Sequence, residues 1–245
     1  MLKFKLRNLI FTGLLVSIGI LLSQLFSFYY PPSTTIVKFG IGYVPLIIIS
    51  LLFGPQYGLF AGITQDIIGY FLLGSERGIF YFGFTLNAIL YGVLPGIFIY
   101  LKRKIKPNKF VYFNTALSLV LSFASIWYLF HINSLSSNAN FTFIYRYILV
   151  SISLVSSLGL LFINYYFYYK KNESNEFQFI FFVVTILYFI VSIVLTPLWI
   201  YDMYSIPFFV QIPLRILKMP VEVILYTLIL QRLLKVIGLQ LNHDT

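Results

Sequence analysis

Long apolar runs follow one another along the whole chain, and only short polar or basic stretches separate them. A water-soluble domain usually takes about a quarter of its residues from the charged types, whereas here 10% are charged and 60% are hydrophobic. A soluble chain of 245 residues could not hide that much apolar surface. We therefore expect an all-α fold, a polytopic membrane helical bundle with the lipid bilayer as its surroundings.

The apolar runs predict about eight transmembrane helices. They cover approximately residues 8–28, 40–53, 57–73, 79–101, 110–130, 145–169, 177–200 and 208–237. The second and third runs are shorter than the ~20 residues that a perpendicular crossing needs, and only Gly54-Pro55-Gln56 separates them. Such short runs can still cross if their loop-side ends lie in protein or in water.

The distribution of basic residues predicts the topology. If the amino terminus lies inside, 12 of the 17 cations fall on the inner side. These are Lys3, Lys5, Arg7, the five cations of residues 102–109, Lys170, Lys171, Arg232 and Lys235. The outer side receives Lys38, Arg77, Arg146, Arg215 and Lys218. This bias follows the positive-inside rule, so we expect a multi-pass protein of the cell membrane with both termini in the cytoplasm.

The net charge of +10 does not indicate a nucleic-acid partner. A basic footprint for nucleic acid clusters on one folded face beside groove-reading or aromatic partners, whereas these cations lie in short runs between apolar spans. We therefore expect a protein that binds no nucleic acid.

Sites for catalysis or metal are also not expected. The chain has no cysteine, and of its two histidines His131 lies in a predicted loop and His243 at the carboxyl end. There is no G-x-x-x-x-G-K-[ST], G-x-S-x-G or H-E-x-x-H motif, and seven acidic residues leave little material for acid–base catalysis. A proton-coupled carrier would have to use Asp66 or Glu222, and no relay of titratable residues accompanies either. We expect no enzyme, cofactor or metal.

Residues 38–92 combine features that a plain lipid anchor does not need. They contain the two short runs, the Gly-Pro break, the mid-helix carboxylate of Asp66 and a polar-aromatic loop. Interrupted helices at membrane depth are tolerated where they line a cavity, and an ionisable residue there indicates a functional site. This stretch is predicted to form half of a binding cavity that opens on one membrane face. Asp66 either accepts from an amino group of a solute or is satisfied by Ser, Thr or backbone donors.

Arg215 and Lys218 lie in the outer half of the last run, three residues apart and therefore on one helix face. A cation there costs at least ~2.5–3.5 kcal/mol unless it faces protein or water. The alternative is that Lys218 pairs with Glu222 while Arg215 snorkels to the headgroups. Together with Lys38 and Arg77 near the same membrane face, they predict a cationic cavity that suits an anionic solute.

Aromatic residues accompany these charges. Phe84, Thr85 and Asn87 open the fourth run beside the aromatic residues 80–82, and Trp199 and Tyr204 lie near the end of the seventh. Aromatic faces with a few polar groups suit a planar heteroaromatic ligand. One residue in five is aromatic, however, and an interfacial aromatic belt would explain the same residues without a ligand.

The first run carries two small residues, Gly13 and Ser17, four positions apart. A face of small residues lets another helix approach closely, although small residues are common in membrane helices.

Several spaced positions resemble the folate-family substrate-binding (S) component of energy-coupling factor (ECF) transporters. In the first part these are Lys38-Phe-Gly-Ile-Gly-Tyr-Val-Pro45, Leu52-Phe-Gly-Pro55, Gly58, Gly62, Asp66, Gly69-Tyr70, Gly83-Phe-Thr-Leu86 and Ala88. In the last part they are Leu198-Trp199, Tyr204, Pro207-Phe208, Arg215 and Pro220-Val-Glu222. The resemblance covers residues 1–101 and 177–237. The chain departs from the family pattern at Phe82, where proline is usual, and at Thr196-Pro197, where Asn-Thr is usual.

The resemblance implies a membrane-embedded vitamin-binding subunit without an ATPase of its own. Its partners would be a transmembrane coupling subunit, which the small face of Gly13 and Ser17 would meet, and two ATP-binding cassette subunits. The implied mechanism is reorientation of the whole subunit in the membrane, which carries folate or a reduced folate from outside to inside. From this resemblance together with the charged and aromatic residues described above, the expected substrate-binding residues are Lys38, Asp66, Phe84, Thr85, Asn87, Trp199, Tyr204, Arg215 and Lys218.

The S components of this family usually have six helices, so residues 110–169 are interpreted as a two-helix insertion. The chain then divides into a core of residues 1–101, a basic loop and insertion of residues 102–176, and a second core part of residues 177–245. Two alternatives stay open. One is an S component for another vitamin, such as riboflavin or pantothenate, and the other is a structural membrane protein without a ligand.

Overall fold

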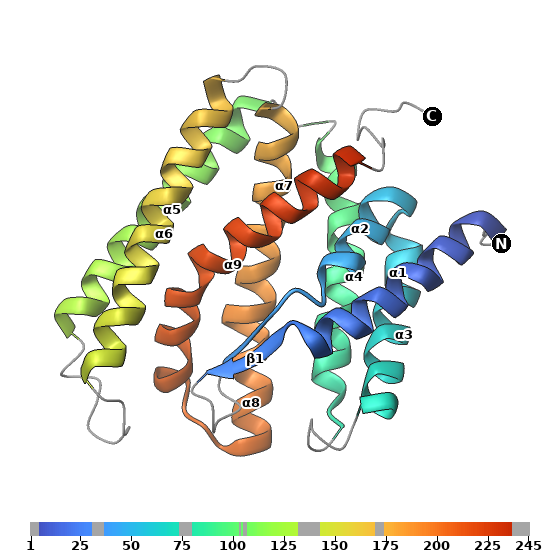
Figure 1. The fold of residues 1–245 in the computed structure, drawn as a ribbon, viewed down its shortest axis with the longest axis horizontal. Helices are drawn as coiled ribbons and strands as arrows, with labels where there is room; N and C mark the ends of the chain where they lie inside the picture. Colours follow the sequence, from blue (N-terminus) through green and yellow to red (C-terminus); the bar gives the residue numbers. More distant parts are fainter. Residues whose placement is uncertain are drawn as a thin grey trace.

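The computed structural model of the chain describes residues 5–30, 37–73, 80–102, 104, 107–131, 143–169 and 174–236. Its elements are α1 (Leu6–Leu25), β1 (Ser27–Tyr30), β2 (Val37–Gly40), α2 (Val44–Phe53), α3 (Pro55–Leu73), α4 (Phe82–Lys102), α5 (Pro107–His131), α6 (Phe143–Tyr169), α7 (Ser174–Leu187), η2 (Tyr188–Leu195), α8 (Thr196–Tyr204) and α9 (Phe208–Val236). The helix α7, the π-helical segment η2 and the helix α8 are continuous and count as one long helix. The described residues therefore form eight helices (Figure 1). The predicted all-α membrane bundle is confirmed.

Three of the described helices are long and apolar enough to cross a membrane. They are Leu6–Leu25, Phe82–Lys102 and the continuous helix Asn175–Tyr204. The end of the bundle where α4 finishes and α7 begins is opposite the end that carries α8 and the β-hairpin (Figure 1).

Helix α2 is short because it lies inside protein. Its 10 residues rise about 15 Å at ~1.5 Å per residue, half of a ~30 Å hydrocarbon core. All residues from Val44 to Leu51 are buried, and α1, α3, α4 and α9 pack against the helix. The condition expected for a short membrane helix, that it is enclosed by protein, is therefore met.

The Gly-Pro break turns the chain from α2 into α3. Gly54 adopts φ 95°, a region that a side chain would disfavour, and Pro55 is the first residue of α3. Helix α3 thus begins two residues before the predicted start at residue 57.

Helices α3 and α4 pack with their backbones in close approach. A Cβ at Gly58 of α3 would overlap the carbonyl of Gly92 of α4, and one turn further Gly62 faces the backbone of Ala88 in the same way. Small residues four positions apart allow this packing in membranes, where dispersion contacts and not the hydrophobic effect hold helices together. The close approach sets the position of α4, four of whose residues line the cavity described below.

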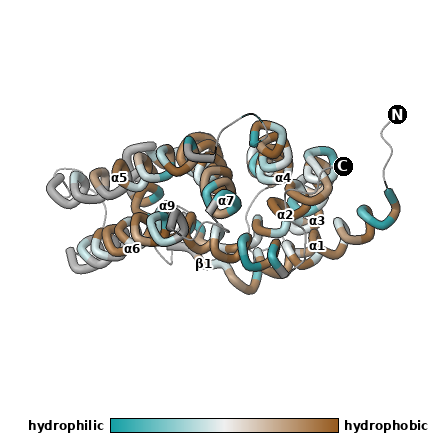
Figure 2. The backbone as a smooth tube through the Cα atoms, turned by 90° about the horizontal axis from the view of Figure 1, so that it is seen from above, coloured by the Kyte–Doolittle hydropathy of each residue, from teal (hydrophilic) through white to brown (hydrophobic). Residues whose placement is uncertain are grey.

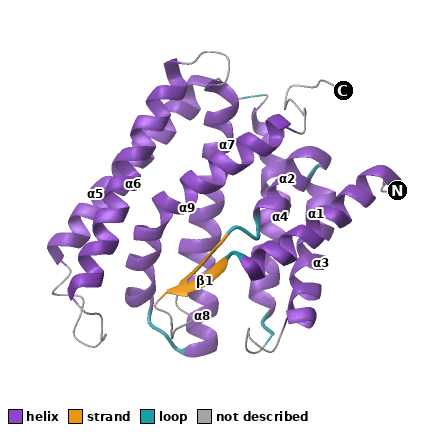
Figure 3. Cartoon of the chain, viewed as in Figure 1, coloured by secondary structure: helices purple, strands orange, loops and turns teal. Residues whose placement is uncertain are grey.

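The connection between α1 and α2 contains a β-hairpin, which was not predicted (Figure 3). Strands β1 and β2 are antiparallel, with Ser27 opposite Gly40 and Phe28 opposite Phe39. The predictions that the first helix reaches residue 28 and the second begins at residue 40 are therefore wrong. Short apolar runs do not distinguish strand from helix by periodicity, and here pairing between the two runs decides.

Two further boundaries differ from the sequence-based expectation. Residues 201–204, expected in a turn, continue α8 to Tyr204, and Ser205 ends the helix in a left-handed conformation with φ 54°. His131, expected in a loop, is the last residue of α5. Three cations used in the topology prediction lie outside the described residues. They are Arg77, expected on the outer side, and Lys170 and Lys171, expected on the inner side.

Helices α5 and α6 form an antiparallel pair that packs against α7 and α9. Figure 2 shows this pair at one end of the elongated molecule and α1 at the other, with apolar residues over much of the helix surfaces. A buried amide chain joins the pair to α7. Asn114 Nδ2 donates to the carbonyl of Gln178 (3.0 Å) and to its Oε1 (2.6 Å), and Gln178 Nε2 donates to Asn164 Oδ1. Such hydrogen bonds fasten helices together in an apolar environment.

Candidate functional site

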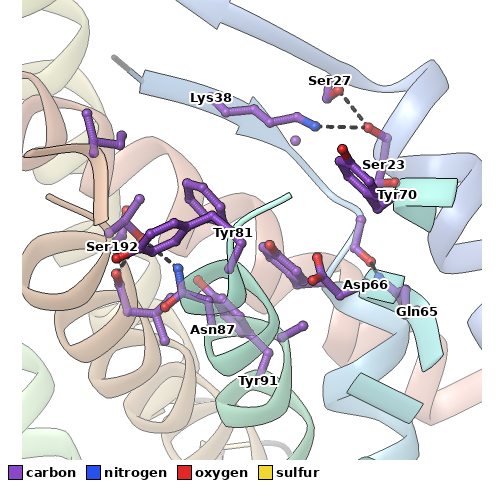
Figure 4. Close-up of a pocket in the computed structure, with 18 of the residues that line it drawn as sticks. Ser23, Ser27, Lys38, Gln65, Asp66, Tyr70, Tyr81, Asn87, Tyr91 and Ser192 are labelled. Carbon is purple, nitrogen blue, oxygen red and sulfur yellow. Dashed lines mark hydrogen bonds between the residues drawn. The ribbon is translucent and has the colours of Figure 1, made fainter. Parts of the chain in front are cut away.

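A cavity of ≈ 230 Å³ lies between the β-hairpin and helices α1, α3, α4, η2, α8 and α9 (Figure 4). It is somewhat smaller than the ~300–1,000 Å³ usual for ligand pockets. The lining residues are Ser23, Ser27, Lys38, Gly40, Gly42, Tyr43, Gln65, Asp66, Tyr70, Phe80, Tyr81, Phe84, Asn87, Ala88, Tyr91, Val191, Ser192, Thr196, Ile200, Tyr204, Arg215, Lys218 and Glu222. Within the described parts of α5 and α6, no residue lines it.

The side chains of α4 that line the cavity lie on one face of the helix. Phe84, Asn87, Ala88 and Tyr91 occupy positions i, i+3, i+4 and i+7, which form one face of a helix. The rotation of α4 is held on the adjoining side, where the backbone of Ala88 and Gly92 packs against Gly62 and Gly58 of α3.

Arg215 is held on the π-helical segment. Its side chain is buried (4% exposed), and Nη1 donates to the carbonyl of Ser192 (3.1 Å) and to its Oγ (3.4 Å). The Tyr188 hydroxyl donates in turn to the Arg215 carbonyl (2.9 Å). The alternative in which Arg215 snorkels to the headgroups is therefore wrong. The guanidinium lies at the cavity wall, inside protein.

Lys218 forms a buried ion pair with Glu222 one turn further along α9. Its Nζ lies 2.5 Å from Glu222 Oε2, and the two side chains are 5% and 13% exposed. Lys218 Nζ also donates to the carbonyl of Lys38, and it lies over the rings of Phe39 (5.0 Å) and Tyr188 (5.7 Å). The expected alternative, a pair with Glu222, is confirmed, and the same lysine ties β2 to α9.

The cavity has a positive balance. Its described lining includes the cations Lys38, Arg215 and Lys218 and the carboxylates Asp66 and Glu222, one positive charge in excess. Lys38 Nζ donates to the carbonyl of Ser23 (3.3 Å), at the point where α1 ends and the hairpin begins (Figure 4). In the low-dielectric surroundings of the cavity, a net positive charge attracts an anionic ligand more strongly than it would in water.

Asp66 both lines the cavity and has an internal partner. The hydroxyl of Thr85 donates to Asp66 Oδ2 at 2.6 Å. Thr85 itself is 1% exposed and does not line the cavity, so it lies behind the carboxylate and orients it. The expected internal satisfaction of Asp66 by a threonine is thus observed, and the carboxylate still faces the cavity.

Asn87 connects α4 to α8. Its Nδ2 donates to Thr196 Oγ1 (3.1 Å), and its Oδ1 accepts from the indole of Trp199 (3.2 Å). Thr196 Oγ1 donates to the carbonyl of Val191 (2.6 Å). Trp199 does not line the cavity, so it supports Asn87 from behind.

Aromatic rings form much of the remaining wall. Tyr43 and Tyr91 stack with their ring centroids 4.5 Å apart and their planes at 11°. At the rim, the Tyr81 hydroxyl donates to Asp202 Oδ2 at 2.6 Å. This hydrogen bond, with the negative charge of Asp202, raises the pKa of the Tyr81 phenol above its ordinary value. The hydrogen bond joins Tyr81, just before α4, to Asp202 of α8.

The structure brings seven of the nine expected substrate-binding residues into the lining of this cavity. These are Lys38, Asp66, Phe84, Asn87, Tyr204, Arg215 and Lys218. Thr85 and Trp199 lie behind the lining. The expected partner-facing residues Gly13 and Ser17 are exposed on α1, and nothing in the described residues lies within 4 Å of a Cβ added to Gly13.

Several lining residues were not expected from the sequence, among them Gln65, Tyr43, Tyr91 and Ser192. Gln65 Nε2 donates to the carbonyl of Gly42 (2.9 Å). Tyr91 lies seven residues after Phe84, so helical periodicity alone would have identified it. Ser192 had no such signal, because the π-helix shifts its position relative to an α-helical register.

Three comparisons with known proteins relate the chain to one group of transporters. A family model described as "ECF transporter, substrate-specific component" matches residues 7–147. The curated relative "Folate transporter FolT" of Clostridium novyi (strain NT) is 27% identical over 99 residues, which are 40% of this chain and 54% of the relative. The match thus spans about half the length of this relative, which is the shorter of the two proteins.

A solved structure shares the fold. "Crystal structure of FolT bound with folic acid" superposes with a TM-score of 0.54 and covers 94% of this chain and 93% of that chain, at 18% identity.

Proposed function

Since the chain belongs to the family of ECF transporter substrate-specific components, we propose that it captures folate or a reduced folate on the outer face of the membrane. The observation that carries the proposal is the cavity that joins Arg215, Lys218 and Lys38 to the stacked pair of Tyr43 and Tyr91. Folate combines a flat aromatic pterin with an anionic glutamate, and these need an aromatic face and a cationic group. The names of the folate transporter relative and of the structure with bound folic acid support the same ligand.

Delivery of the ligand would use partner proteins. The sequence has no Walker A motif, so energy would come from two ATP-binding cassette subunits through a transmembrane coupling subunit. The protein would have no ATPase activity of its own. The face of α1 that carries Gly13 and Ser17 is open in the described structure and suits close packing of a coupling helix. The α5–α6 pair lies at the far end of the molecule from α1 and would leave this face accessible (Figure 2).

The distribution of charges supports the proposed topology, with both termini in the cytoplasm. Of the described cations, Lys102 ends α4 and Lys235 lies in the last turn of α9, at the same end of the bundle. By the positive-inside rule, this end would lie in the cytoplasm. The end with the hairpin, where the cavity lies, would then face outward, as capture of an external vitamin requires.

The decisive experiment is a titration of the purified protein in detergent with folate, a reduced folate, riboflavin and pantothenate. Arg215→Ala should weaken folate binding about tenfold or more, because hydrogen bonds to charged groups contribute ~1.5–3 kcal/mol. Arg232→Ala is the matched control, since Arg232 is exposed on the same helix and outside the cavity. Saturable binding of riboflavin or pantothenate without folate binding would show that the ligand is another vitamin. No saturable ligand at all would support a structural role.

The proposed partnership has a separate readout. Gly13→Leu should reduce the amounts of coupling subunit and ATP-binding cassette subunits that co-purify, while the folate dissociation constant stays unchanged. Co-purification at the original level would show that this face of α1 is not the docking surface.

A further inference from the structure

The long helix Asn175–Tyr204 changes from α to π geometry beside the cavity. The π-helical segment η2 spans Tyr188–Leu195, and α8 follows with Pro197 among its first residues. Proline inside a helix has no N–H to donate, and its ring clashes with the carbonyl four residues earlier. A local change to the wider π turn is one way in which a helix accommodates such a residue.

The hydrogen bonds of the segment show which backbone carbonyl lacks an N–H donor within the helix because of Pro197. The Thr196 N–H donates to the carbonyl of Val191, five residues earlier, as the π pattern requires. By the same pattern the carbonyl of Ser192 would accept from the N–H of residue 197. Residue 197 is proline, so the helix offers Ser192 no such donor. Ser192 is buried (7% exposed), and a buried carbonyl needs a partner.

Arg215 provides that partner. Its Nη1 donates to the carbonyl of Ser192 at 3.1 Å, and the first residue of η2, Tyr188, donates to the carbonyl of Arg215 at 2.9 Å. The backbone and the side chain of Arg215 therefore both rest on the π-helical segment. Ser192 and Arg215 line the cavity side by side.

We propose that Pro197 is a positioning residue for Arg215. By withholding a backbone N–H, Pro197 keeps the carbonyl of Ser192 available, and this carbonyl holds the guanidinium at the cavity wall. The proposal rests on the proposed function only for the consequence that ligand affinity depends on Pro197. The coupling between Pro197 and Arg215 is a property of the protein without ligand.

The first test needs no ligand and uses a double-mutant cycle of Pro197→Ala and Arg215→Ala, read by thermal unfolding in detergent. In the wild-type background, Arg215→Ala leaves the Ser192 carbonyl buried without a donor. In the Pro197→Ala background the new N–H supplies the donor, so the fall in Tm caused by Arg215→Ala should be smaller by about 4 °C. Equal falls in both backgrounds would overturn the proposal.

Pro95→Ala is the matched control, because Pro95 also lies inside a helix and does not line the cavity. It should show no coupling to Arg215→Ala. A coupling of the same size at Pro95 would mean that the effect is a general response to removal of a helix proline, and the proposal would fail.

The second test measures folate affinity in the same variants. Pro197→Ala should weaken binding about tenfold in the wild-type background and less than about twofold in the Arg215→Ala background. A tenfold loss in both backgrounds, or no loss in either, would contradict the positioning role. If the wild-type protein binds no folate, the proposed function fails, and the thermal cycle still decides the role of Pro197.

Discussion

Replacing Glu222 by glutamine should have opposite effects on the stability of the protein and on its affinity for an anionic ligand. Glu222 pairs with Lys218 at 2.5 Å, and the two side chains are 13% and 5% exposed. The substitution removes the negative charge of the Glu222 side chain and nearly preserves the shape of the side chain. Lys218 keeps its hydrogen bond to the Lys38 carbonyl and loses the carboxylate that compensates its charge.

The magnitudes follow from burial and charge. Removing one partner of a buried ion pair costs ~3–5 kcal/mol, and glutamine, which still offers an oxygen acceptor, belongs at the lower end. For a chain of this length about 3 kcal/mol corresponds to a fall in Tm of roughly 6–12 °C. The excess charge of the described cavity lining rises from one to two. A unit charge about 10 Å from a ligand carboxylate, at an effective dielectric constant of ~20, contributes ~1.7 kcal/mol, which is about tenfold in affinity.

The assay measures Tm by intrinsic fluorescence and the folate dissociation constant by calorimetry, on the same preparation. Glu176→Gln is the matched control, since Glu176 lies in the first turn of α7 and outside the cavity lining. It should change Tm by less than about 3 °C and affinity by less than about twofold. An unchanged Tm for Glu222→Gln, or a loss of stability accompanied by weaker folate binding, would refute the reasoning.

Two further predictions concern packing and the polar link between helices. Gly58→Val should lower Tm by more than about 10 °C or prevent folding, because its side chain would overlap the Gly92 carbonyl; Gly13→Val, where a Cβ meets nothing within 4 Å, should leave Tm unchanged. Asn87→Ala removes the acceptor of the Trp199 indole, so the emission spectrum of Trp199 should shift and folate binding should weaken about tenfold; an unaltered spectrum would argue against the hydrogen bond.

Much of the site was predictable because helices repeat. Arg215, Lys218 and Glu222 stand at positions i, i+3 and i+7 and share one face of α9, as their spacing indicates. The charge pattern also predicted a cationic surface. What the spacing could not decide was which of the two alternatives for Lys218 holds. Lys218 both pairs with Glu222 and lines the cavity, because the ion pair is itself part of the cavity wall.

Neighbouring residues on α4 show where prediction from sequence stops. Phe84 and Thr85 were both expected at the ligand, yet Phe84 lines the cavity and Thr85 lies behind Asp66. Which of two adjacent residues faces inward depends on the rotation of the helix. That rotation is set by the approach of Gly92 to Gly58 on another helix.

By itself, the sequence determined that the chain is a helical membrane protein, because so few charges cannot keep so much apolar surface in water. It also determined the break between α2 and α3, since Gly54 and Pro55 restrict the backbone locally. Only the tertiary structure decided that the carbonyl of Ser192 receives Arg215 and that a hairpin covers the cavity. Both features depend on pairing between separate segments of the chain, and residue spacing within one segment carries no information about the partner that it meets.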